Sequence, residues 1–283
     1  MGIGIASWLK SLLTDGRPGN PCALSSERGQ LRCNDSQPAG PLSYSRSGRS
    51  ESGATITAGT AIGSGESHVE TDRLAFNEQH EEPRPDGLQE WFHKNGKLRE
   101  RQAYHAGVKD GAWELFHENG QLRSRGNYKD GKRCGFFAVF HNNGQLRSRG
   151  NHKDDTRDGH YESYFENGQL DAKGTYVDGK KCGSWEWFYE TGQLRIRGSY
   201  THDRQDGCFE EYGESGRLRL RECYRDGRRD GPYQSFDKEG RLKTKAIYKA
   251  GVLDGSCELY DDSGLVMETI DYKDGVRQKQ TKK

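Results

Sequence analysis

A glycine recurs every 24 residues through the last two thirds of this chain, eight times without a gap. An aromatic residue follows five residues after each of these glycines, and a second glycine follows four residues after the aromatic one. A fixed period of this length predicts a repeat architecture, in which each unit packs only against its neighbours. The eight period glycines are Gly87, Gly111, Gly135, Gly159, Gly183, Gly207, Gly231 and Gly255.

The composition argues against one large hydrophobic core. Of the 283 residues, 30% are hydrophobic and 31% are charged, and the mean hydropathy is −1.10. The 14 tyrosines, 10 phenylalanines and 5 tryptophans are more aromatic residues than disordered chains usually carry. The formal net charge of +1 gives no bulk attraction to nucleic acid or to an anionic membrane, so any electrostatic preference must come from the placement of charges.

Three regions follow from the change of pattern along the chain. Residues 1–85 are rich in Gly, Ser and Pro and are predicted to form a disordered leader, with room for a short helix over residues 5–13. Residues 86–276 hold the repeat array, and residues 277–283 form a basic tail.

Each unit contains two segments of strand length, such as AWELFH and QLRSRGNY, split by ENG and followed by KDGKRCG. This pattern predicts one β-hairpin per unit, joined to the next by a second turn. The hairpin turn is either a two-residue loop on Asn119 and Gly120 or a three-residue loop over residues 118–120. Thr191 and Glu239 stand where the two-residue loop needs positive φ, so the three-residue loop, with positive φ at its glycine alone, is favoured.

In this register Phe116, Leu122 and Tyr128 share one face of the sheet and form an apolar stripe. The other face carries Trp113 and Leu115 with the two arginines of the second strand. The predicted fold is therefore all-β: an elongated, single-layer antiparallel meander of eight 24-residue hairpins. With two strands per unit, the array is roughly 75 to 80 Å long.

The arginine-bearing face is the candidate binding surface. Basic residues form two columns along the second strands, and a column of aromatic rings runs beside them, opposite the second basic column. One interpretation is a self-satisfied face whose arginine stems cover the rings. The other is a contact surface for an acidic partner protein. The candidate contact residues are Trp113, Arg123, Arg125, Phe137, Arg147, Arg149, Tyr161, Trp185, Arg195, Arg197, Arg219 and Arg221.

No cofactor, metal or catalytic site is expected. His93, His117 and His141 form a column, but a spacing of about 9 to 10 Å is too wide for one metal ion. Nearly every Glu, His and Arg belongs to such a column, whereas catalysis needs a unique group, and no nucleotide-binding or nucleophile motif occurs. The seven cysteines are odd in number and include no C-x-x-C pair, which favours reduced thiols in a cytoplasmic protein.

The unit also resembles a known repeat. Its pattern, seen in Gly111, Trp113, Phe116, Gly120, Leu122, Tyr128 and Gly131, resembles the MORN repeat, and more closely a variant found in bacterial proteins similar to antitoxin components. The resemblance covers residues 87–275, and it departs from the pattern at Asp155 and Asp203, which replace the turn glycine.

The resemblance implies a twisted meander of hairpins that serves as a binding or scaffolding surface. In the bacterial proteins it implies an antitoxin or immunity partner that neutralises a toxin, and in eukaryotic relatives a scaffold or contact with membrane lipids. We therefore expect a protein partner, with membrane phospholipid as the alternative, reached through the basic and aromatic columns or the N-terminal segment. Nucleic acid is disfavoured because glutamates repeat as regularly as arginines, and a homodimer joined at the ends of the array is a further option.

Overall fold

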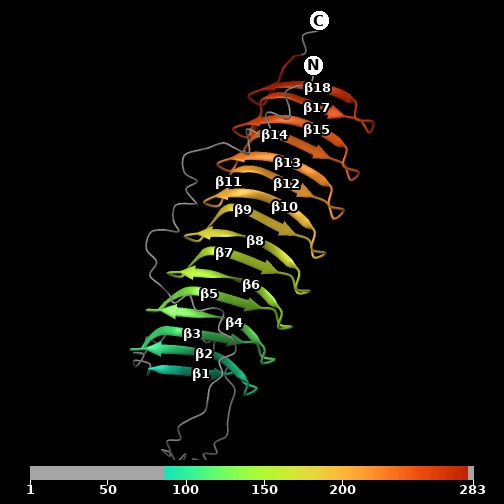
Figure 1. Ribbon diagram of the computed structural model, residues 1–283. Helices are drawn as coiled ribbons and strands as arrows, with labels where there is room; N and C mark the ends of the chain where they lie inside the picture. Colours follow the sequence, from blue (N-terminus) through green and yellow to red (C-terminus); the bar gives the residue numbers. More distant parts are fainter. Residues whose placement is uncertain (1–85, 280–283) are drawn as a thin grey trace, which may run out of the picture.

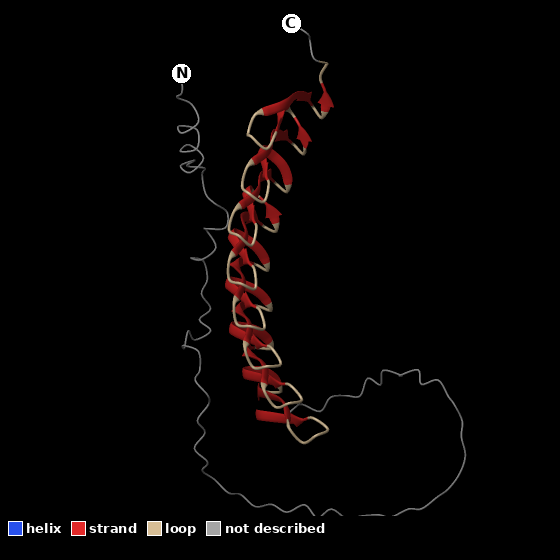
Figure 2. Ribbon diagram, turned by 90° about the vertical axis from the view of Figure 1, so that its right-hand side faces the viewer, coloured by secondary structure: helices blue, strands red, loops and turns tan. Residues whose placement is uncertain are grey.

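A computed structural model describes residues 86–279 as one antiparallel β-sheet of nineteen strands. The predicted leader, with its helix over residues 5–13, and the last four residues of the tail lie outside the described residues. Successive strands pair in chain order, so the sheet is a meander that climbs from β1 to β19 (Figure 1). From the side the array is one sheet thick and bows along its length (Figure 2). The predicted all-β meander is confirmed.

Eight hairpins account for sixteen of the strands: β1/β2, β3/β4, β5/β6, β7/β8, β9/β10, β12/β13, β14/β15 and β17/β18. The short strands β11 and β16 are interrupted beginnings of β12 and β17, and β19 begins a ninth unit. No helix long and apolar enough to cross a membrane occurs between residues 86 and 279. The bounds are β1 Gly87–Phe92, β2 Leu98–His105, β3 Val108–Phe116, β4 Leu122–Lys129, β5 Lys132–Phe140, β6 Leu146–Lys153, β7 Thr156–Tyr164, β8 Leu170–Val177, β9 Lys180–Phe188, β10 Leu194–Thr201, β11 Arg204–Gln205, β12 Gly207–Tyr212, β13 Leu218–Arg225, β14 Arg228–Phe236, β15 Leu242–Lys249, β16 Val252–Leu253, β17 Gly255–Tyr260, β18 Val266–Lys273 and β19 Val276–Arg277.

The turn inside each hairpin is the predicted three-residue loop. In the β3/β4 hairpin the backbone N–H of His117 donates to the carbonyl of Gln121, and that of Gly120 donates to the carbonyl of His117, both at 2.8 Å. Gly120 has φ of 90°, and Asn119 keeps negative φ. The Asn119 side chain accepts the N–H of Gln121 at 2.9 Å, which fixes the loop from within. Only the glycine therefore needs the left-handed region, as expected.

The turn between hairpins is a two-residue loop with positive φ at both positions, for example 48° at Asp130 and 80° at Gly131. Asp155 and Asp203 replace the glycine of this turn and adopt φ of 69° and 67°. Aspartate tolerates this region better than most residues. Each carboxylate also accepts a backbone N–H from the preceding unit, from Arg133 at 3.0 Å and from Lys181 at 2.8 Å. The two departures from the repeat pattern thus keep the turn intact.

The second strand of each hairpin contains one extra residue, and this changes the predicted faces. Phe116 pairs with Leu122, but Leu115 pairs with Ser124, so Arg123 is a β-bulge. Beyond the bulge the register is shifted by one residue, which moves every later side chain of the strand to the opposite face. The prediction that Tyr128 shares a face with Phe116 and Leu122 is therefore wrong.

Tyr128 instead lies on the face of Trp113, with ring centroids 6.2 Å apart. The shifted register places Trp113 directly opposite Gly126 rather than opposite Arg125. A Cβ at Gly126 would come within 2.9 Å of the indole nitrogen, so the ring covers the glycine. Between adjacent hairpins, Trp185 of β9 likewise covers Gly174 of β8, and Phe209 of β12 covers Gly198 of β10.

These rings form the core of the array. Trp185 is 2% exposed, and Phe137 and Phe209 are 6% and 7% exposed. Rings of adjacent hairpins pack together: Tyr176 packs edge-on against Trp185 with centroids 5.1 Å apart, and Phe209 packs against Tyr200 at 5.3 Å. A single hairpin cannot bury such rings alone, so stability depends on stacked neighbours.

Two cysteines that were predicted to be reduced form a disulfide. Cys208 in β12 lies directly opposite Cys223 in β13, and their sulfurs are bonded. The predicted register would have placed Cys208 opposite Glu222, so the missed bulge also concealed this pair. Cys257 is a free thiol.

The glycine beneath Trp185 is expected to tolerate no side chain. The substitution Gly174→Ala places a Cβ inside the indole, and relieving such overpacking costs roughly 1–3 kcal/mol of unfolding free energy. Gly213→Ala is the matched control, because its Cβ would meet the flexible Arg219 side chain at 3.2 Å and the Ser215 hydroxyl at an ordinary 3.8 Å. Urea unfolding followed by tryptophan fluorescence measures both. Equal midpoints for the two variants would contradict the ring-over-glycine packing.

The Cys208–Cys223 bond is expected to stabilise the β12/β13 hairpin. It closes a loop with a sequence separation of 15, for which chain entropy predicts a contribution of roughly 3 kcal/mol. The double variant Cys208→Ser, Cys223→Ser should therefore unfold at lower urea concentration. Peptide mapping without reductant should recover the two cysteines as one linked fragment. Alkylation of both thiols in the native, unreduced protein would show that the bond is absent.

Candidate protein-binding surface

The bulge divides the predicted contact residues between two faces of the sheet. We call the face that carries Trp113, Tyr128 and their equivalents the aromatic face, and the face that carries Glu114, Phe116 and their equivalents the ion-pair face. The prediction that all the contact residues lie on one face is therefore wrong. The aromatic face holds Trp113, Arg123, Phe137, Arg147, Tyr161, Trp185, Arg195 and Arg219, whereas the ion-pair face holds Arg125, Arg149, Arg197 and Arg221.

On the ion-pair face, arginines and lysines pair with glutamates of the adjacent strand. Arg149 Nε donates to Glu162 at 2.6 Å, and Lys173 lies 2.8 Å from Glu186. Most of these pairs join one hairpin to the next, so they link the units of the array. The pairs are Arg101–Glu90, Arg101–Glu114, Arg149–Glu162, Lys173–Glu186, Arg197–Glu210, Arg221–Glu210 and Lys245–Glu258.

Glu210 shows how fully this face satisfies its own charges. It accepts hydrogen bonds from Arg197 at 2.5 Å, from Arg221 at 2.5 Å and from the Tyr212 hydroxyl at 2.6 Å. Burial alone would raise the pKa of Glu210, but these three hydrogen bonds and the charge of Arg221 lower it to about 2. Tyr164 makes the same contact with Glu162, and burial together with that hydrogen bond raises the pKa of Tyr164 to about 12. The self-satisfied interpretation therefore holds for this face.

The rings of the aromatic face are covered rather than displayed. A second set of cations, from the start of each first strand, lies over them: Arg157 is 4.9 Å from the Tyr161 ring centre, and Lys181 is 4.8 Å from that of Trp185. Burial lowers the pKa of Lys181. Phe137 and Trp185 are buried. They hold the sheet together from within.

The arginines of the bulge position differ from the cations that pair with glutamates on the ion-pair face and from those that lie over the rings. Arg99, Arg123, Arg147, Arg195 and Arg219 are exposed, and within residues 86–279 none of them forms an ion pair or a hydrogen bond. We call these five the bulge arginines. The same position holds Asp171 in the fourth unit, and in the seventh it holds Lys243, which pairs with Asp262 at 2.5 Å. The bulge pushes these side chains out of the cross-strand pairing that satisfies the other arginines.

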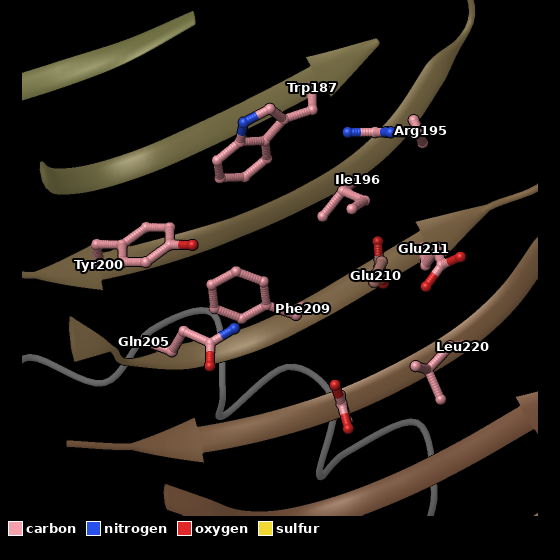
Figure 3. A pocket seen from close by; sticks show the side chains of 10 residues that line it. Trp187, Arg195, Ile196, Tyr200, Gln205, Phe209, Glu210, Glu211 and Leu220 are labelled. Carbon is pink, nitrogen blue, oxygen red and sulfur yellow. The ribbon is translucent and has the colours of Figure 1, made fainter. Parts of the chain in front are cut away.

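Two of the bulge arginines border open grooves on the aromatic face. Arg195 lies beside Ile196 and Trp187, above a groove of about 260 Å³ that Tyr200 and Phe209 also line (Figure 3). Arg147 borders a wider groove together with Tyr161 and Phe165. Each groove thus places an unpaired guanidinium next to aromatic surface, which is the combination that protein interfaces favour.

The hairpin turns form a separate ladder along one edge of the array. The Nε2–H of His93 donates to the carbonyl of Phe116 at 3.0 Å, and His141 does the same to Tyr164 at 2.9 Å. Asn95 donates to the carbonyl of Glu118, one repeat further on, at 2.9 Å. The histidine column therefore ties neighbouring turns together. In the described part of the chain no cluster of three His, Cys, Asp or Glu side chains is placed to hold a metal ion.

Comparison with protein families supports the repeat assignment. The matched segments are residues 85–106, 109–130, 157–178 and 181–202. Four of the repeats match the MORN repeat variant. The matched segments include the hairpins that carry Arg99, Arg123 and Arg195. The qualifier that likens the chain to antitoxin components gains no support from this match.

A comparison with curated proteins found no match. Among solved structures, a crystal structure of the GtfA/B complex bound to UDP and GlcNAc shows 15% identity over 42% of this chain, with a TM-score of 0.18. A crystal structure of TcdB2-TccC3 shows 10% identity over 68% of this chain, with a TM-score of 0.20. The chain spans 25% and 13% of those two proteins. At these TM-scores neither likeness carries a functional argument.

Lowering the pH should remove the contribution of Glu210 to the stability of the fold. Because its folded pKa is depressed, the stability it adds is present above its ordinary value of 4.5 and is lost as the pH falls toward 2. The variant Glu210→Gln should be less stable than the wild type at pH 7, and the gap should narrow between pH 4.5 and 2. Thermal unfolding across this range measures it, with Glu118→Gln, an exposed turn substitution, as the control. A gap that stays constant with pH would contradict the assignment.

Proposed function

We propose that this protein is a non-enzymatic, cofactor-free binding module whose aromatic face contacts an acidic partner protein. MORN repeats are consistent with a repeat protein in binding or scaffold roles. The observation that carries the proposal is the row of bulge arginines, which are exposed and unpaired while the arginines of the opposite face are neutralised by glutamates. An unpaired row of one sign attracts the opposite charge and fixes the register of a partner.

The aromatic face suits a protein better than other polyanions. Its grooves combine guanidinium groups with half-buried rings and with the carboxylates of Glu211 and Asp171. The phosphates of a nucleic acid would be repelled by those carboxylates, so nucleic acid remains disfavoured. A protein surface can match both signs of charge within one contact.

The finer form of the proposal is that the partner is a toxin, which the array neutralises as an antitoxin or immunity protein. Covering a toxin requires a rigid surface of several repeats, and the inter-repeat ion pairs supply that rigidity. We further propose a cytoplasmic location, peripheral to a membrane at most. In a reducing compartment the Cys208–Cys223 pair would be open.

The alternative is a structural scaffold that associates with membrane phospholipid. The bulge arginines support it as well, because an exposed basic row also attracts anionic headgroups. A homodimer joined at the ends of the array stays a prediction. Leu265, Val266 and Met267, exposed by 68%, 52% and 72% on the last hairpin, mark where one end would meet another.

The proposal is tested with the product of the gene adjacent to this one as the candidate partner. The triple variant Arg123→Glu, Arg147→Glu, Arg195→Glu should keep the fold and lose copurification of that protein by at least about tenfold. The control variant Lys132→Glu, Lys153→Glu, Arg228→Glu makes the same charge change at exposed positions away from the bulge and should bind as the wild type does.

Three outcomes decide between the readings. Copurification and protection from the partner's toxicity, both lost in the bulge variant alone, support the antitoxin form. Equal loss in both triple variants would show that only net charge matters and contradict the assigned surface. Flotation with anionic vesicles and no copurification would favour the scaffold.

A further inference from the structure

We propose that the bulge arginines bind an acidic segment in the polyproline II conformation, laid along the long axis of the array, with an acidic side chain at every third residue. This inference rests on the proposed function and names the chemistry of the partner segment. It follows from the spacing of the arginines, from their unpaired state and from the grooves beside them.

The spacing of the bulge arginines matches one turn of a polyproline II helix. Equivalent residues of successive repeats lie two strands apart, or about 9.4 to 9.8 Å. A polyproline II helix has three residues per turn and rises about 3.1 Å per residue, so it advances about 9.3 Å per turn. Side chains at i, i+3 and i+6 therefore point to the same side and meet successive arginines.

Other backbone conformations fit the row less well. In a β-strand, residues i and i+3 point to opposite faces, so only every second arginine would find a partner. In an α-helix, a spacing near 9.6 Å corresponds to about 6.4 residues, and successive contacts would rotate around the helix by about 80°. Of these three conformations, only polyproline II matches the spacing of the arginines and also points every contact side chain towards them.

The grooves beside the row suit such a segment. Polyproline II ligands dock on aromatic-lined grooves, where prolines pack between rings. Arg195 borders a groove lined by Trp187, Tyr200 and Phe209, and Arg147 borders one lined by Tyr161. These two repeats then offer a guanidinium for the acidic residue beside a groove for the two residues that follow it.

Asp171 sets the register of the ligand. It occupies the bulge position between Arg147 and Arg195, and its carboxylate accepts a hydrogen bond from the Ser163 hydroxyl at 2.8 Å, on the aromatic face. An acidic ligand residue opposite Asp171 would be repelled by its carboxylate. The free row ends after Arg219, because Lys243 is already paired with Asp262. The preferred ligand therefore carries acidic residues opposite Arg99, Arg123 and Arg147, a neutral residue opposite Asp171, and acidic residues opposite Arg195 and Arg219.

The experiment uses the full chain and fluorescently labelled 18-residue peptides, measured by anisotropy at physiological salt. The matched peptide carries Glu at positions 1, 4, 7, 13 and 16 with proline and serine elsewhere, and its reversed sequence covers the opposite chain direction. An isomer of the same composition carries the five Glu at every second position. The matched peptide in one direction should bind about tenfold more tightly than the isomer.

Two substitutions test the individual steps. Arg147→Gln should weaken the matched peptide severalfold, whereas Lys153→Gln, the same change outside the row, should not. Adding Glu at position 10 should weaken binding to the wild type. In the variant Asp171→Arg the same addition should strengthen binding, which a merely structural effect of the substitution would not produce.

Equal binding of matched peptide and isomer, or an unchanged affinity in Arg147→Gln, would overturn the inference. If the adjacent-gene product still depends on the bulge arginines in that case, the proposed function stands and only the ligand conformation falls. Binding to anionic vesicles with no peptide binding would also overturn it and would favour the scaffold.

Discussion

One extra residue in the second strand of each hairpin determines what each face of this protein carries. Without the bulge at Arg123, period two would place Trp113 opposite Arg125 and put Arg123 and Arg125 on the Trp113 face, apart from the glutamates of the other face. With it, Trp113 covers Gly126, and Glu114 meets Arg125. The core rings, the inter-repeat ion pairs and the unpaired arginines all follow from this one shift, repeated along the array.

The two faces of the sheet have different structural roles. The ion-pair face holds the stack together, since most of its pairs bridge adjacent hairpins and Glu210 alone receives three donors. The aromatic face buries the rings between glycine and an overlying cation, as in the contact of Lys181 with Trp185. The bulge arginines lie outside both arrangements. Its arginines are therefore available to a partner at no cost to the fold, which is why the binding proposals centre on them.

Much of the fold could be predicted from the residues alone. The 24-residue period indicated one hairpin per unit, and Thr191 and Glu239 indicated the three-residue loop that the structure confirms. The bulge could not be read from local preference, because any residue can occupy it. A signal was nevertheless present: glycines inside the second strands, at Gly126, Gly150, Gly174 and Gly198, are typical of a bulge or of a close approach by another group. The disulfide was missed for the same reason, since Cys208 faces Cys223 only in the shifted register.

The account depends on the register after the bulge, and proton NMR tests that register most directly. If Trp185 covers Gly174, ring current should shift the Gly174 Hα resonances upfield, and both should show nuclear Overhauser effects to the indole. Unshifted Gly174 Hα resonances, with no Overhauser effects to the indole of Trp185, would contradict the register after the bulge. The division of the two faces would then fail.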